Sequence, residues 1–62
     1  MKLPRIARFE IFQGMDEQWY WRLRGANNEV MASSEGYVSK GNAERGAKAA
    51  RAAARFALLK DV

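Results

Sequence analysis

The order of apolar and polar residues in this chain predicts strands in its first half and a helix in its second half. Between residues 8 and 13, and again between residues 19 and 24, apolar and polar residues alternate. A period of two places successive side chains on opposite faces, as in a strand with one buried side. A third apolar stretch follows the polar pair Asn27-Asn28. The pattern therefore predicts three strands joined by two turns.

The positions of the turns predict how these strands pair. A loop centred on Asp16 would pair Ile11 with Trp21, and a slip of one residue would send Ile11 to the wrong face. A two-residue loop at Asn27-Asn28 requires positive φ at both positions, which Asn tolerates better than most residues. In these registers seven apolar residues of the three strands share one face of an antiparallel meander, whereas Phe12 would point to the other face. The seven residues are Phe9, Ile11, Trp19, Trp21, Leu23, Val30 and Ala32.

The C-terminal part of the chain predicts a helix that covers this face. Ser39 is a suitable N-cap, and the residues from Lys40 to about Leu59 are mostly strong helix formers. Such a helix would be about 30 Å long. Small apolar residues recur at helical spacing and predict its inward face. They are Ala43, Gly46, Ala47, Ala50, Ala54, Ala57 and Leu58. We expect a Trp ring to lie against Gly46 and to leave no room for a Cβ atom.

These elements define an α+β domain, a three-stranded antiparallel meander covered on one face by a C-terminal helix. We expect residues 1–7 to form a loose N-terminal arm and residues 8–62 to form the single domain. A chain of 62 residues buries only about 60% of its unfolded surface, so its stability is marginal without help. Without Cys that help cannot come from a disulfide, and we expect a homodimer.

Composition restricts the chemistry that the chain can perform. It contains no His and no Cys, so the common nucleophile–base pairs and the usual zinc sites cannot be built. We expect no catalytic residues, no cofactor, no metal and no small-molecule substrate. The first residues lack the apolar run of a signal peptide, and no stretch has the roughly 20 apolar residues of a membrane span. We therefore expect a cytoplasmic protein that does not enter membranes.

The formal charge of +4 permits an anionic partner without identifying one. Basic and aromatic residues on the outer sheet face and a basic row on the helix could bind the phosphates of a nucleic acid. These candidates are Tyr20, Arg22, Arg24, Arg45, Lys48, Arg51 and Arg55. The alternative is that both surfaces are ordinary solvated faces, with Glu10 pairing with a neighbouring Arg.

Other apolar residues have no place in a one-sided core and are candidates for the dimer contact. They are Phe12, Met31, Phe56 and Leu59. The sequence leaves open whether the sheet face, an edge strand or the helix forms that contact. The run from Ser33 to Gly36 has the residue types of a site, but we interpret it as a strand end and a corner in which Gly36 permits positive φ.

Several segments resemble the small YegP-like proteins, a family of unknown function. They are FEIF at 9–12, WYWRL at 19–23, ANNEVMASSEGY at 26–37 and Ser-Lys at 39–40. The resemblance extends over roughly residues 9–50. It implies a β-β-β-α unit, which occurs in the family as a tandem repeat or as a single copy that dimerises. This chain has one copy, so the resemblance favours a homodimer that imitates the tandem form.

Two features differ from the family pattern. The family usually has Asn-Gly in the second turn, where this chain has Asn27-Asn28, and its helix carries larger apolar residues than the Ala-rich helix here. The resemblance supplies no catalytic residues, because none are established for the family.

Overall fold

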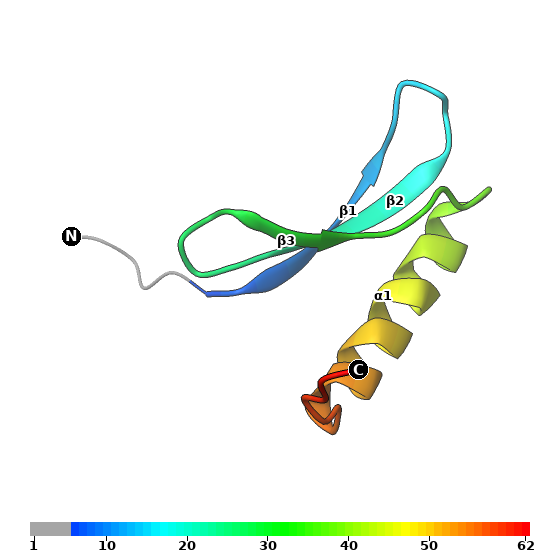
Figure 1. Ribbon diagram of the computed structural model, residues 1–62. Coiled ribbons are helices and arrows are strands. Elements are labelled where there is room, and N and C mark those ends of the chain that lie inside the picture. Colours follow the sequence, from blue (N-terminus) through cyan, green and yellow to red (C-terminus); the bar gives the residue numbers. More distant parts are fainter. Residues whose placement is uncertain (1–5) are drawn as a thin grey trace.

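The computed structural model describes residues 6–62 and contains a three-stranded antiparallel sheet followed by one helix (Figure 1). The elements are β1 (Arg8–Gln13), β2 (Trp19–Arg24), β3 (Val30–Ser33) and α1 (Lys40–Arg55). The strand order β1-β2-β3 is that of a meander, which confirms the expected α+β fold. Most of the expected N-terminal arm, residues 1–5, lies outside the described residues.

The first hairpin has the predicted register. Ile11 is opposite Trp21 across the β1–β2 ladder. The Gly14 amide donates to the Gln18 carbonyl at 2.8 Å, and Glu17 has a φ of 66°. A three-residue loop whose last residue is left-handed is a common hairpin connection, since its twist suits the flanking strands.

The second hairpin differs from the two-residue loop expected at Asn27-Asn28. This turn lies within the described residues, and in it Asn28 alone has a positive φ, of 70°. The Gly25 amide donates to the Glu29 carbonyl at 2.8 Å, as in the first hairpin. The two turns therefore have the same three-residue geometry. The Asn-Asn pair suits this loop as well as it suits the expected two-residue loop.

This longer loop moves Val30 off the predicted apolar face. Leu23 is opposite Ala32, as expected, but the next pair is Arg24 with Val30, and the register shifts between the two pairs. Met31 is the extra residue of this bulge. Residues directly opposite each other share a face, so Val30 lies on the side of Arg24, and half of its surface is exposed.

The chain that leaves β3 continues along β2 instead of turning away. The Ser34 side chain accepts from the Trp21 amide at 2.9 Å. Two residues after Glu35, Tyr37 exchanges a pair of backbone hydrogen bonds with Trp19, each of 2.7 Å. The expected corner at Gly36 is present, but its φ is not positive. A side chain at Gly36 would instead collide with Gln18.

The helix begins where Ser39 predicts and ends earlier than expected. The Ser39 hydroxyl accepts from the Asn42 amide at 3.1 Å, which is an N-cap. The last helical residue is Arg55, with Phe56 as the C-cap, so residues 57–62 are not helical. Residues 51–62 are all exposed, so this end lacks the packing that short helical turns need to persist.

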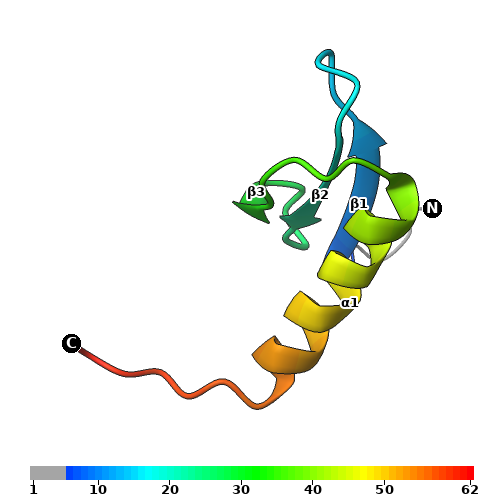
Figure 2. The same cartoon turned by 90° about the vertical axis from the view of Figure 1, so that its right-hand side faces the viewer.

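The buried face of α1 is correspondingly shorter than predicted. Ala43 and Ala47 are buried, whereas Ala54, Ala57 and Leu58 are exposed. In both views the C-terminal end of α1 lies away from the strands (Figures 1 and 2). The helix packs on β1 and β2 and does not contact β3.

At Gly46 the helix lies too close to its neighbours to leave room for a Cβ atom. A Cβ atom there would lie 3.3 Å from Trp21 Nε1 and 2.8 Å from Cζ of Tyr37, and it would also collide with the Tyr37 hydroxyl. The expected contact with a Trp ring is therefore present, but Tyr37 makes the closer one. The Trp21 ring also meets Phe9 edge to face, with the ring centroids 5.3 Å apart.

Candidate functional site

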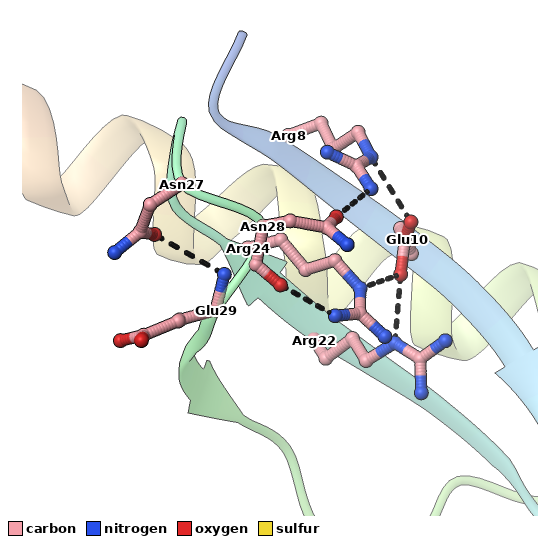
Figure 3. Close-up of polar contacts among 7 residues, drawn as sticks. All are labelled: Arg8, Glu10, Arg22, Arg24, Asn27, Asn28 and Glu29. Atoms are coloured by element: carbon pink, nitrogen blue, oxygen red, sulfur yellow. Dashed lines mark hydrogen bonds and ion pairs between the residues drawn. The ribbon is translucent and has the colours of Figure 1, made fainter. Parts of the chain in front are cut away.

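Three arginines converge on the carboxylate of Glu10 on the sheet face opposite α1 (Figure 3). Each of them uses its Nε atom. Arg22 and Arg24, both from β2, donate to Oε1 at 2.7 Å, and Arg8 donates to Oε2 at 3.0 Å. Alternation along the strands brings these side chains together, since Glu10 is opposite Arg22 and Arg8 is opposite Arg24. One negative charge therefore faces three positive charges.

The arginines strongly favour the ionised form of Glu10. Hydrogen bonds from Arg22 first, and then from Arg24, lower the pKa of its carboxyl from 4.5 to about 2, against a smaller desolvation effect. The carboxylate therefore stays charged in mildly acidic solution.

The same cluster holds the turn between β2 and β3. Arg8 Nη2 donates to the side-chain oxygen of Asn28 at 2.6 Å, and Arg24 Nη1 donates to the Asn28 carbonyl at 2.8 Å. Asn28 is the residue with positive φ in this turn. The cluster therefore ties the start of β1 to a turn twenty residues away in the sequence.

A row of aromatic contacts extends the cluster toward the first turn. The Arg22 guanidinium lies over the Phe12 ring, 4.5 Å from its centroid, and Phe12 stacks on Tyr20 at 5.6 Å. The Tyr20 hydroxyl donates to Asp16. This hydrogen bond is the main cause of a lowered pKa at Asp16 and a raised pKa at Tyr20.

The structure therefore brings together the sheet candidates Tyr20, Arg22 and Arg24 and separates them from the basic helix residues on the other side of the sheet. Arg45, Lys48, Arg51 and Arg55 are exposed. Arg45 donates to the Asn42 side chain of its own helix, and Arg55 lies over the Phe56 ring. All ion pairs found among residues 6–62 involve Glu10, so none includes the helix row.

The four candidates for a dimer contact do not form one surface. Phe12 lies in the aromatic row on the outer face, and Met31 lies in the bulge, where its sulfur is 3.0 Å from the position of a Cβ at Gly25. Phe56 and Leu59 are at the exposed C-terminal end of α1 and beyond it, with 79% of Phe56 accessible.

The sequence alone indicated an ion pair between Glu10 and a neighbouring Arg, which the structure confirms. It did not indicate that three arginines share this carboxylate, or that Asn28 and Asp16 take part. The available signal was the strand register, which places Glu10 opposite Arg22 once Ile11 is paired with Trp21. The Asn28 contacts depend on the conformation of the second turn, for which the residue pattern indicated a different loop.

Three further findings apply to residues 6–62. They contain no cluster of three or more acidic residues placed to hold a metal ion. No pocket opens among them. The helix in this part of the chain is too short and too polar to cross a membrane.

Comparison with known proteins places this meander and helix in a class of small α+β domains. An NMR solution structure of a protein from Haloferax volcanii superimposes with a TM-score of 0.78 at 30% sequence identity, covering 94% of this chain and 98% of that one. Residues 15–61 match the family described as Domain of unknown function (DUF1508). The chain belongs to this family, which confirms the resemblance seen in the sequence.

Two curated relatives come from Neisseria meningitidis. They are UPF0339 protein NMB1088 of a serogroup B strain and UPF0339 protein NMA1193/NMA1859 of a serogroup A strain, each 44% identical over 36 residues. Each match covers 58% of this chain and 64% of the relative. The matched part of the chain thus spans less than two thirds of the length of these relatives.

Proposed function

We propose that the chain acts as a non-catalytic module that forms a homodimer, in which a second copy covers the apolar surface at the C-terminal end of α1. The observation that supports this proposal is the small size of the core. Among residues 6–62 the buried hydrophobic residues are Ala43 and Ala47, and no large side chain is fully buried. Domains of this size usually obtain additional stability from a disulfide, a metal or a partner subunit, and the sequence has neither Cys nor His.

The uncovered apolar residues lie where a second copy could pack. Phe56 is 79% exposed and Leu58 is 92% exposed, and both are beyond the part of α1 that covers the sheet. Because α1 does not contact β3, the helix side of β3 is also open. A helix contributed by a second copy would bury these residues and receive the same cover in return, as a two-fold dimer requires.

Sedimentation of a Phe56→Ala, Leu59→Ala double variant tests this proposal. Both side chains are exposed in the isolated chain, so their loss should leave the protomer folded. Burying side chains of this size contributes about 1.5–3 kcal/mol each, so the loss of two should raise the dimer dissociation constant at least ~100-fold. Unchanged self-association in the double variant would contradict the proposed contact.

Met15 supplies the matched control. It is also exposed, but it lies in the turn between β1 and β2, at the end of the sheet away from the C-terminal end of α1 (Figure 1). Met15→Ala removes a comparable apolar side chain, and we expect it to leave the dissociation constant unchanged.

A second candidate function is weak binding of nucleic acid without sequence specificity. The observation that favours it is the excess of positive charge on the outer sheet face, where three arginines share one carboxylate beside two aromatic rings. Titration of labelled oligonucleotides at low salt tests this candidate, because phosphate contacts weaken steeply as salt is added. A complete lack of binding at low salt would exclude it.

A further inference from the structure

The arginines around Glu10 differ in how many of their donors are already used. Arg8 and Arg24 each donate one Nε and one terminal nitrogen to acceptors within the cluster. Arg22 donates only Nε, to Glu10. Within the described part of the chain, neither terminal nitrogen of Arg22 meets an acceptor, and Figure 3 shows both pointing away from the other residues drawn.

The Arg22 guanidinium is nevertheless held firmly in place. Its Nε is 2.7 Å from Glu10 Oε1, and its plane lies over Phe12 with Cζ 4.5 Å from the ring centroid. Two contacts of different kinds thus fix a planar group whose outer edge carries a pair of N–H donors. Such a pair matches two oxygens of a phosphate, and little side-chain freedom would be lost on binding.

The surroundings of this donor pair also favour an anion that carries an aromatic ring. Arg8 and Arg24 leave the cluster with two more positive charges than Glu10 neutralises. Next to Arg22, the stacked and half-buried rings of Phe12 and Tyr20 continue along the same face. A basic group that contacts the backbone beside an aromatic surface is typical of proteins that bind single-stranded nucleic acid.

We propose that Arg22 is the phosphate-binding residue of a single-stranded nucleic-acid site on the outer sheet face, with Glu10 and Phe12 as its positioning residues. The two terminal nitrogens of Arg22 donate to one phosphodiester group, and Tyr20 receives an adjacent base, since the Phe12 ring is already in contact with Arg22 and Tyr20. This assignment rests on the second candidate function above and adds to it the face, the residue and the form of nucleic acid.

The test uses Arg22→Lys, which keeps the charge and removes the planar pair of donors. Its control is Arg51→Lys, the same exchange at an exposed position of the basic row of α1. Both variants keep the formal charge of +4, so the long-range attraction to a polyanion is the same. Affinity for a fluorescein-labelled oligothymidylate is measured at low salt by anisotropy, and far-UV circular dichroism checks that each variant is folded.

We expect Arg22→Lys to weaken binding roughly tenfold and Arg51→Lys to leave it unchanged. If the parent binds the oligonucleotide but Arg22→Lys has no effect, or Arg51→Lys has the larger one, the assignment to Arg22 is wrong while nucleic-acid binding itself stands. If the parent does not bind, both are wrong.

A measurement on the parent protein keeps the test decisive even if Arg22→Lys does not fold. In an NMR titration, adding the oligothymidylate to isotope-labelled protein should shift the resonances of the Arg22 Nε–H and of the backbone amides of Phe12 and Tyr20. Shifts confined to residues of α1 would overturn the proposal.

Discussion

Replacing Gly46 with Ala tests how closely the helix approaches the sheet. Two effects oppose each other. Ala is about 1 kcal/mol more favourable than Gly in a helix interior. Against this gain, the new Cβ would lie 2.8 Å from Tyr37 Cζ and would meet the Tyr37 hydroxyl, well inside the optimal carbon–carbon separation of about 3.5–4.0 Å.

Tyr37 cannot easily move away. Its backbone exchanges two hydrogen bonds of 2.7 Å with Trp19, so only its ring can adjust, and Trp21 Nε1 is 3.3 Å from the same Cβ position. Overpacking of this kind costs about 1–3 kcal/mol. Set against the helix gain of about 1 kcal/mol, the net change in the free energy of unfolding should range from about zero to 2 kcal/mol of destabilisation.

Gly41 provides the control in the same helix. A Cβ there would meet only Arg45 Nη1, at 3.6 Å, which is an ordinary contact. Gly41→Ala should therefore stabilise the protein by up to about 1 kcal/mol. The two variants should differ by about 1–3 kcal/mol, measured by urea denaturation at one fixed protein concentration, since a dimer's stability depends on concentration.

Introducing Gly46→Ala into a second variant, Tyr37→Phe, shows whether Tyr37 causes the loss of stability. In a Tyr37→Phe protein, which lacks the colliding hydroxyl, Gly46→Ala should cost about 1 kcal/mol less than in the parent, a coupling typical of residues in contact. If Gly46→Ala stabilises the parent as much as Gly41→Ala does, the described approach of helix and sheet is wrong.

Three other predictions concern the sheet and the cap. Because the pKa of Glu10 is lowered to about 2 in the fold from 4.5, its contribution to stability is complete above pH 4.5 and declines as the pH falls toward about 2. Acid titration of Glu10→Gln followed by circular dichroism should lack this decline, and an identical acid transition would contradict the role of the cluster. Trp21→Ala removes the ring that meets Phe9 and should cost about 3–5 kcal/mol, so that it melts far below the parent; equal melting would refute its place in the core. Ser39→Ala removes the N-cap and should lower the free energy of unfolding, measured by urea denaturation, by about 1 kcal/mol. Ser33→Ala, at an exposed position, is the control and should leave that free energy unchanged.

The sequence predicted those parts of the fold that depend on local patterns. Alternation around Phe9 and Trp21 determines which side chains face the helix, and it gave the register of the first hairpin correctly. The Ser39 cap was predictable because its hydroxyl needs only the amide three residues later.

The second turn and the end of the helix were not predictable from those patterns. Asn27-Asn28 suits both a two-residue loop and the three-residue loop that forms, and the difference decides whether Val30 faces the helix side. Helix propensity continues through Leu59, but packing against the sheet stops near Ala50, and packing rather than propensity stabilises most helices in proteins.

The candidate site was predicted only in part. Arg22 and Arg24 were recognised as basic residues on the outer face, but the dependence of both on Glu10 requires three side chains from two strands to meet. The free donor pair of Arg22 depends on which nitrogen contacts Glu10, and a sequence pattern contains no such information.

Sedimentation equilibrium of the parent chain tests most directly whether a second copy completes this small core. The chain has a mass of 7.0 kDa. At micromolar concentration we expect a particle of twice that mass, which dissociates on dilution with a parallel loss of thermal stability. A folded particle of 7.0 kDa at every concentration, with a melting temperature independent of dilution, would contradict the proposal.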